Sequence, residues 1–446
     1  MIPPKSSSGR AAVGRFDVIV CGAGAGGLAL ARALGQAGRS VLVVDRQRQD
    51  RSRFKGEVLQ PRSLEILAAL GALQSLVDQG GVEAYRLTCR ASTGAELCSL
   101  DYTSLAPEFG PFGHCLMSHY GQIKGALAEG LAPGVEVRRG VSATRLITES
   151  SGRVGGVELT QNGERWQARA SLTVACDGYA SRLRAAAGIE VCPQRYDHQL
   201  AAFDLAGVAP LAPELTVYLT RPGFRVLIPM PGGRAHLYAQ VPPGALRATG
   251  RAGFAEVARE MLETTPGLAR LGEALKASLD TAQVMSALRF NAPQWYRPGL
   301  ALAGDAAHSV HPMAAQGMNA AIADAWTLSE QLAGAALTPT AVDAALERYE
   351  SERRERMAYV GRLSHNLTSM FGATSRPVRV LRHHMLARNR DNRRLQQILA
   401  YNMSGLGVHR FGLRDRLQQF GLPDLGTRRE PLAGRDSRGP YDLVAR

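Results

Sequence analysis

The stretch FDVIVCGAGAGGLALARALGQAGRSVLVVD, from Phe16 to Asp45, carries the pattern of a nucleotide-binding fold. It opens with an apolar run of the length of a buried parallel strand, and SVLVVD at its end predicts a second strand. Between them a glycine-rich turn leads into an alanine- and leucine-rich helix that ends near Gly38. The stretch therefore predicts one βαβ unit of a Rossmann-type α/β fold.

The glycines of this turn, Gly22, Gly24 and Gly27, have the spacing of a dinucleotide-binding loop. The first allows the tight turn, the second lets the backbone approach a pyrophosphate, and the third lets helix and strand pack closely. The helix N-terminus then presents N–H groups and its positive dipole end to the phosphates. Asp45 ends the next strand, where a carboxylate can bind the adenosine ribose, and Arg46 beside it is a further candidate. The motif does not specify which dinucleotide binds.

A second loop follows the apolar strand in LTVACDGYASRLR, which runs from Leu172 to Arg184. Asp177 and Gly178 end this strand. Open α/β sheets bind their ligands at the carboxyl ends of the strands, so both residues are candidate cofactor contacts. Taken alone, the pair is equally typical of a plain turn from strand to helix.

A third loop, LALAGDAAHSVHPMAAQGMN, again places a glycine and a carboxylate, Gly304 and Asp305, after a predicted strand. Asp305 can hydrogen-bond a polyol such as a ribityl chain, and the N-terminus of the next helix can stabilise negative charge on a reduced flavin ring. Two separated anchors predict a long dinucleotide, FAD in an extended pose. The residues expected at the flavin side are Pro312, Met313, Gly317, Met318 and Asn319. His308 and His311 are more typical of structural histidines than of acid–base groups.

Composition and charge narrow the class of protein. The chain has 446 residues, 45% of them apolar, as in a globular protein of two domains with appendages. Its six cysteines include no C-x-x-C pair, so we expect no zinc site, no disulfide framework and a cytoplasmic location. The first residues contain no apolar core for a signal peptide, and no apolar run approaches the roughly 20 residues of a membrane span.

The net charge of +14 is carried almost wholly by arginine, with an excess after residue 351. Such a stretch is typical of a solvated helix face or of a surface that binds an anionic partner. A basic nucleic-acid-binding protein is therefore an alternative, but no RNA-binding signature with paired aromatic residues is present, and we expect no nucleic acid partner. A weak, peripheral association with an anionic membrane surface stays open.

In order and spacing, the three loops resemble those of the class A flavoprotein aromatic monooxygenases, the para-hydroxybenzoate hydroxylase-like family, over roughly residues 15 to 335. The family's D-G-x-x-S-x-x-R stands at Asp177 to Arg184, and its G-D-A-A-H-x-x-x-P at Gly304 to Pro312. The resemblance implies one FAD, reduced by a transient NADPH or NADH. It also implies that O2 reacts as a flavin C4a-hydroperoxide, which hydroxylates or epoxidises an aromatic, quinone-like or other lipophilic ring.

Residue by residue, the resemblance implies that Asp305 holds the ribityl chain and that Asp177 lies at the diphosphate and the nicotinamide path. Arg53 and Lys55 resemble the family's basic pair near the pyrophosphate.

The pattern along the chain also indicates an organisation in parts, and the Asn162-Gly163 pair between GVELT and RWQAR predicts a hairpin. We expect a Rossmann-type FAD-binding domain, an inserted β-sheet-rich substrate domain and a helical C-terminal region. In residue numbers, this means a disordered lead over 1–14, the FAD-binding domain over 15–80, 111–194 and 291–340, the substrate domain over 81–110 and 195–290, the helical region over 341–426 and a polar tail over 427–446.

Two parts of the site stay undefined by the sequence. The family often has an arginine before the helix where this chain has His119 and Tyr120, so its adenine-side contact departs from the pattern. A phenolic substrate would also need a proton acceptor. Arg225, His236 and Tyr238 lie on predicted strands, but their register is undetermined and none is singled out.

Two other chemistries use the same scaffold. A flavin-dependent halogenase would carry a W-x-W-x-I-P segment, whereas Trp166, Trp295 and Trp326 are isolated here. A flavin reductase that saturates a prenyl chain would work without O2.

Overall fold

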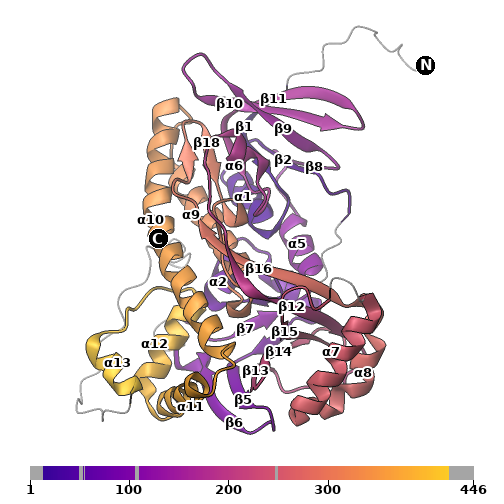
Figure 1. Ribbon diagram of the computed structural model, residues 1–446. Helices are drawn as coiled ribbons and strands as arrows, with labels where there is room; N and C mark the ends of the chain where they lie inside the picture. The colour runs from indigo at the N-terminus through magenta and orange to yellow at the C-terminus, as the bar shows by residue number, and fades with distance from the viewer. Residues whose placement is uncertain (1–13, 50–53, 55, 106–109, 247–249, 421–446) are drawn as a thin grey trace.

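The computed structural model describes residues 14–49, 54, 56–105, 110–246 and 250–420. Of the lead predicted over residues 1–14, Gly14 begins a strand, and residues 1–13 lie outside the described residues. The candidates Arg53 and Lys55 and the predicted polar tail also lie outside them. Within them, the structure consists of two large sheets, helices between and around them, and a helical C-terminal part (Figure 1).

The first sheet is built on the βαβ unit predicted from the glycine-rich stretch. Its parallel strands follow the order β18 (Leu300–Leu302), β11 (Glu164–Ala175), β1 (Gly14–Cys21), β2 (Val41–Asp45) and β8 (Val135–Arg139). Strand β17 (Tyr296–Arg297) pairs with β18 at one edge. Residues Val18, Ile19 and Val20 of β1 are fully buried, as expected for a strand that is covered on both faces.

Helices cover this sheet and bring the loops together. Helix α1 (Ala25–Gln36) follows β1 and packs against α9 (Gly317–Ala333) and α5 (Tyr120–Ala128). Beyond the parallel strands, β9 (Ser142–Thr148) and β10 (Val154–Gln161) extend β11 as antiparallel partners. Asn162, at the predicted hairpin turn between β10 and β11, has a φ of 53° and Gly163 one of 90°. The hairpin prediction is confirmed.

The second sheet is mostly antiparallel. Its order is β19 (His308–Ser309), β16 (Gln283–Asn291), β12 (Gln194–Leu205), β15 (Arg234–Val241), β14 (Gly223–Met230), β13 (Glu214–Thr220), β5 (Arg86–Ala91) and β6 (Glu96–Asp101). Only the β13–β5 pair is parallel among the described strands of this sheet. A small sheet of β3 (Val58–Leu59), β7 (Cys115–Met117) and β4 (Val82–Ala84) contacts β13 and β14 of the second sheet. Helix α2 (Pro61–Ala69) packs against β7 and is followed by α3 (Leu73–Asp78).

One face of the second sheet packs against helices that the strand pattern did not predict. Helix α7 (Gly250–Thr264) and helix α8 (Gly272–Ala277) fall inside the segment expected to be rich in sheet. Their buried Met261 and Leu275 pack against Phe203 and Leu237 of the sheet. This face of the sheet is apolar and has to be buried against another element, and the spacing of apolar residues in FAEVAREML is typical of an amphipathic helix.

Three 3₁₀ turns, at Pro266–Leu271, Leu279–Thr281 and Tyr102–Leu105, connect neighbouring elements.

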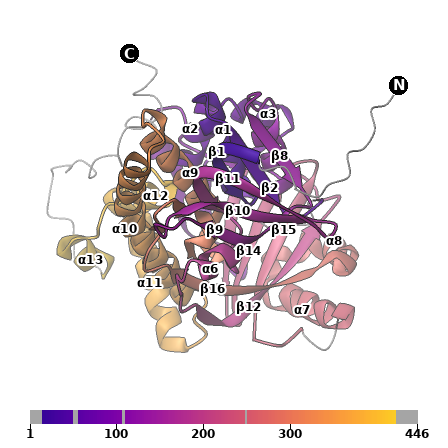
Figure 2. The same cartoon turned by 90° about the horizontal axis from the view of Figure 1, so that it is seen from above.

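The C-terminal part is helical, as predicted. It contains α10 (Pro339–Phe371), α11 (Arg376–Asp391), α12 (Arg393–Ser404) and α13 (Leu413–Gln419). Helix α10 runs from the first sheet to the second, and the C-terminal helices lie on the side opposite α7 and α8 (Figures 1 and 2). The predicted fold class is confirmed, whereas the domain boundaries stay a prediction. No helix among the described residues has the length and apolar character of a membrane span.

Candidate functional site

A cavity of about 720 Å³ lies where the two large sheets approach each other. One wall comes from the three loops predicted to bind the cofactor, and the other from the second sheet. Among the predicted residues, those that line the cavity are Gly24, Gly27, Gly178, Gly304, Asp305, Pro312, Met313, Gly317 and Met318. The structure therefore brings together loops that are up to about 290 residues apart in the sequence.

The glycines of the first loop have different surroundings. A Cβ atom at Gly22, where φ is +123°, would lie 2.2 Å from the carbonyl oxygen of Cys176. A Cβ at Gly27 would lie 1.9 Å from the carbonyl oxygen of Gly22. In the part of the chain that the structure describes, a Cβ at Gly24 would meet only the Tyr120 hydroxyl, at 3.1 Å, and would otherwise enter the cavity. Gly22 and Gly27 are thus required by packing, while Gly24 keeps space free for a ligand.

Tyr120 stands where the family pattern often has arginine. The backbone N–H of Ala25 donates to its hydroxyl at 3.2 Å, and Tyr120 itself lines the cavity. Asp45 accepts hydrogen bonds from the N–H groups of Ala23 (2.8 Å) and Gln47 (2.7 Å). Asp45 thereby supports the glycine turn. The cavity wall, as the described residues form it, includes neither Asp45 nor its neighbour Arg46.

The second loop is tied to the third through Arg184. Helix α6 (Arg182–Ala186) is capped by Ser181, whose hydroxyl accepts from the Arg184 N–H at 3.0 Å. The Arg184 guanidinium donates to the carbonyl oxygen of Ala306 at 2.8 Å. Asp177 accepts from the Arg182 N–H at 2.9 Å with one oxygen. Its other oxygen is buried and has no hydrogen-bond partner among the described residues.

A buried carboxylate, Asp324 of α9, binds the third loop. One Asp324 oxygen accepts from the Gly304 N–H at 2.9 Å and lies 2.7 Å from Nε2 of His308, while the other accepts from Nε of Arg353 at 2.8 Å. Burial alone would raise the pKa of Asp324, but His308 and Arg353 outweigh it and lower that pKa to about 2. His308 is therefore structural in this geometry, as the sequence suggested.

Asn319 fastens the start of α9 to the segment before α2. Its side-chain amide donates to the carbonyl oxygens of Val58 (2.8 Å) and Ala315 (2.6 Å), and its oxygen accepts from the Gln60 N–H at 2.8 Å. Asn319 is not part of the cavity wall formed by the described residues. It positions Met318 and Ala315, both of which line the cavity.

His311, in the same loop, is buried against His198 of the second sheet. The two Nε2 atoms lie 2.9 Å apart, and Nδ1 of His311 accepts from the Met313 N–H at 3.1 Å. Burial, together with the nearby His198 and His365 rings, lowers the pKa of His311 to about 3. The neutral His311 ring thereby holds Met313 at the cavity wall.

The buried pair of His311 and His198 predicts that the folded protein loses stability at acidic pH. Unfolded histidine takes up a proton below about pH 6.5, whereas folded His311 does not until about pH 3, so stability is lost as the pH falls through this window. The free energy of unfolding should fall by about 2 kcal/mol at pH 5 through this residue. Denaturant titrations at pH 7 and pH 5 measure this fall. It should shrink in His311→Asn and persist in His384→Asn, which alters an exposed histidine; equal falls in both variants would contradict the prediction.

The second sheet supplies residues that the sequence did not single out. Apolar side chains such as Phe224, Val226 and Met285 form most of its wall. The wall also includes polar residues, among them Tyr238, whose hydroxyl lies 2.5 and 2.6 Å from the two Glu57 oxygens. Both residues line the cavity. The alternation R-A-H-L-Y in β15 was a usable signal, but nothing local links Glu57 to a strand 181 residues away.

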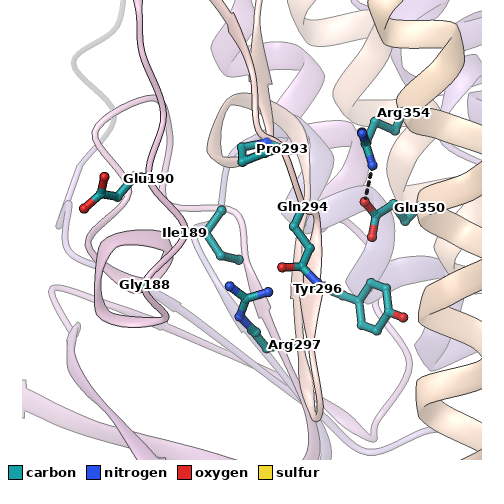
Figure 3. Close-up of a pocket in the computed structure, with 9 residues that line it drawn as sticks. All are labelled: Gly188, Ile189, Glu190, Pro293, Gln294, Tyr296, Arg297, Glu350 and Arg354. Atoms are coloured by element: carbon teal, nitrogen blue, oxygen red, sulfur yellow. Dashed lines mark hydrogen bonds and ion pairs between the residues drawn. The ribbon is translucent and has the colours of Figure 1, made fainter.

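A second hollow, of about 510 Å³, lies between the turn after α6, the segment of β17 and helix α10 (Figure 3). Glu190 stands on one side of it, and on the other Arg354 pairs with Glu350 at 2.9 Å. None of the described residues predicted to bind the cofactor lines this hollow. It is open to solvent and carries no functional assignment here.

The cavity fits an FAD. Gly24 leaves room for a pyrophosphate at the N-terminus of α1, which contains 12 residues and begins at Ala25. Asp305 supplies a carboxylate on the wall, and Gly317 and Met318 bring the N-terminus of α9 to it. The apolar wall beyond them suits a flat, lipophilic ring.

Comparisons with known proteins agree with this geometry. The family model described as "FAD binding domain" matches residues 15–364. The chain is 30% identical over 405 residues to a 6-methylpretetramide 4-monooxygenase of Streptomyces rimosus, covering 88% of this chain and 94% of the relative. It is 29% identical over 335 residues to the squalene epoxidase erg1 of Schizosaccharomyces pombe, covering 72% and 70%.

Solved structures share the fold. A probable FAD-dependent monooxygenase, PqsL of Pseudomonas aeruginosa, superposes with a TM-score of 0.72 at 24% identity, covering 82% of this chain and 98% of that one. The p-nitrophenol 4-monooxygenase PnpA of Pseudomonas putida DLL-E4 superposes with a TM-score of 0.74 at 19% identity, covering 89% and 100%. The comparisons favour a monooxygenase over the halogenase and the prenyl-chain reductase considered above.

Proposed function

This chain belongs to the FAD-binding family of flavoprotein monooxygenases, and we propose that it transfers one oxygen atom from O2 to a polycyclic aromatic or quinone-like ring bound in the 720 Å³ cavity. NADPH or NADH is the reductant. The observation that carries the proposal is the meeting of three cofactor loops and an apolar sheet face at one cavity. The relative of S. rimosus, similar along most of this chain, is a monooxygenase named for 6-methylpretetramide, which favours a large ring.

Each part of the cavity has a role in this proposal. The Gly24 turn and the N-terminus of α1 would hold the FAD diphosphate, and Asp305 would hold the ribityl chain. The N-terminus of α9 at Gly317 and Met318 would bind the electron-rich edge of the ring. When bound, FAD supplies hydride acceptance and the activation of O2. The second sheet would bind the substrate and exclude water from the reacting atoms.

The proposal is tested by anaerobic mixing of the FAD-loaded protein with NADPH or NADH, with and without a panel of hydroxylated polycyclic aromatic compounds. We expect bleaching of the flavin absorbance that one ring class accelerates, followed after admission of air by a product heavier by one oxygen atom. Absence of bleaching with both reductants and every ring would contradict the proposal. A halogenase served by a separate reductase would then become the better explanation.

We also propose that the C-terminal helices contact an anionic membrane surface weakly, where lipophilic rings concentrate. Helix α11 exposes 40%, 63% and 43% of Val378, Val380 and Leu381, and arginines flank them in the sequence. Helix α13 packs against α11 and exposes 76% of Leu413. Apolar side chains with basic neighbours on one helix are typical of interfacial binding.

Vesicle co-sedimentation tests this surface. We expect binding to vesicles that contain phosphatidylglycerol, less binding to pure phosphatidylcholine, and loss of binding as salt rises, because the attraction is partly electrostatic. Val380→Asp should weaken binding, whereas Val77→Asp, at a valine exposed on α3, should not. Equal, negligible sedimentation with both lipids would contradict the proposal.

A further inference from the structure

A line of polar side chains leads from the cavity along one face of the second sheet. Alternate residues of β15, namely Arg234, His236 and Tyr238, share a face because side chains of a strand alternate. Asp204 of β12 lies directly opposite His236 in the strand register. Glu57, which precedes β3, lies between Tyr238 and His236.

The contacts along this line are continuous. The Tyr238 hydroxyl donates to Glu57, whose Oε1 is 2.7 Å from Nδ1 of His236. Nε2 of His236 is 3.4 Å from Oδ1 of Asp204. Asp204 pairs in turn with the Arg234 guanidinium at 2.6 Å. The side chains of Glu57 and His236 are only 5% and 2% exposed, and exposure then rises to 12% at Asp204 and 35% at Arg234. One end therefore borders the cavity and the other reaches solvent.

The charge states make this line suited to proton movement. Burial opposes the charged His236 ring, but its hydrogen bonds to Asp204 and Glu57 outweigh burial and raise the pKa of His236 to about 9. His119, 5.9 Å away ring to ring, and Arg234 are the other described titratable groups nearby. Burial and the Glu57 carboxylate raise the pKa of Tyr238 well above its usual range, so it stays a phenol. An imidazolium between two carboxylates can release a proton towards one carboxylate while the other carboxylate takes up a proton.

We infer that Glu57, His236 and Asp204 carry a proton between a substrate hydroxyl bound at Tyr238 and solvent. This inference rests on the proposed function and deepens it. It implies that the substrate ring bears an ionisable hydroxyl, a phenol or an enol, next to the carbon that is oxygenated. Epoxidation of a plain alkene would require no such path.

The proton transfers balance without a further reactant. The substrate O–H bond breaks and its proton passes to the Tyr238 oxygen, while the Tyr238 hydroxyl proton passes to the Glu57 carboxylate. His236 releases its Nε2 proton towards Asp204 and from there to water. The substrate has then become an anion and one proton has reached solvent. Glu57 and His236 are both neutral, so the net charge of the line is unchanged. The reverse movement returns the proton to the product.

If the line carries a proton, a substitution in it changes the rate at which the substrate hydroxyl ionises. A substitution in a merely structural cross-link would leave that rate unchanged. A substrate hydroxylate is far more electron-rich than the neutral hydroxyl, which favours attack by an electrophilic oxygen. An amide at position 57 preserves shape and hydrogen bonding, but it cannot accept and hold the proton. Glu57→Gln should therefore slow ionisation of a bound hydroxyl and leave the fold intact.

The test uses the FAD-loaded enzyme and two matched probes, 2-hydroxyanthraquinone and 2-methoxyanthraquinone. Ionisation of the hydroxyl probe changes its colour, so stopped-flow absorbance follows proton loss without turnover. In the wild type we expect roughly tenfold tighter binding of the hydroxyl probe than of its methyl ether, and rapid appearance of the anion. Glu57→Gln and His236→Gln should each slow that appearance at least roughly tenfold.

Two further variants keep the result interpretable. Glu214→Gln removes another partly buried carboxylate of the same sheet, paired with Arg90 at 2.7 Å, and should leave the ionisation rate unchanged. Tyr238→Phe should abolish the preference for the hydroxyl probe even if Glu57→Gln fails to fold. Unchanged ionisation rates in both relay variants, or equal affinity of the wild type for the two probes, would overturn the inference.

Failure of this inference is distinguishable from failure of the proposed function. If NADPH bleaches the flavin and the methyl ether is oxygenated as readily as the hydroxyl probe, the monooxygenase stands and the relay does not. If neither NADPH nor NADH bleaches the flavin, the proposed function itself fails, whatever the probes show.

Discussion

Asp324→Ala is expected to lower the free energy of unfolding by roughly 3–5 kcal/mol, because it leaves buried partners without their counter-charge. The Asp324 side chain is 0% exposed, and those of His308 and Arg353 are 1% and 5% exposed. Alanine would strand the Arg353 guanidinium and release the Gly304 N–H in the interior. Both the helix pair α9–α10 and the third loop depend on this carboxylate.

Denaturant unfolding of the FAD-free protein measures this loss. Asp343→Ala is the matched control, since Asp343 pairs with Arg153 at 2.7 Å but is itself 33% exposed, and it should cost about 1 kcal/mol or less. Asp324→Asn keeps the shape and should fall between the two. A loss below about 1 kcal/mol for Asp324→Ala would show that the loop is held by other contacts.

The parts of the fold that the sequence predicted well are those encoded locally. The βαβ unit, the hairpin at Asn162 and the C-terminal helices each follow from spacing within one segment. The three cofactor loops could be recognised for the same reason, since glycines and carboxylates at strand ends mark them. Their meeting at one cavity followed from the rule that parallel strands end at one edge of a sheet.

The unpredicted parts depend on contacts between distant segments. The sequence identified Arg184 as part of a motif but did not predict its contact. Its guanidinium donates to the carbonyl oxygen of Ala306, 122 residues away. Asn319 was expected at the flavin as part of a helix N-terminus, and the contact of its side chain with the segment at Val58 was not predicted. Glu57 was not considered, because its partners stand on a strand whose register no local pattern defines. Side-chain direction in a sheet inverts with a shift of one residue, so such pairs require the three-dimensional structure.

Gly24→Ala is expected to separate cofactor binding from folding. The backbone at Gly24 has φ −76° and ψ 178°, which alanine adopts without strain. Among the described residues, its methyl group would meet only the Tyr120 hydroxyl, at 3.1 Å. The variant should therefore unfold within about 1 kcal/mol of the wild type in the absence of FAD. The methyl group would, however, occupy the space that the pyrophosphate needs, and FAD affinity should fall at least roughly 100-fold, about 2.7 kcal/mol.

Gly27→Ala supplies the contrast, because its methyl group would lie 1.9 Å from a backbone oxygen that cannot move freely. This variant should fail to fold or unfold far below the wild type, with or without FAD. Gly125→Ala, in α5 with no atom within 4 Å of the added Cβ, should match or exceed the wild type in stability, since alanine favours a helix. FAD titration of the apoprotein, followed by flavin fluorescence, measures the affinities. If Gly24→Ala bound FAD as tightly as the wild type, the pyrophosphate could not lie at this turn, and the cofactor assignment of the first loop would be wrong. The loop is specific in this sense: of three glycines close together in sequence, packing requires Gly22 and Gly27, whereas Gly24 leaves the space that the ligand needs.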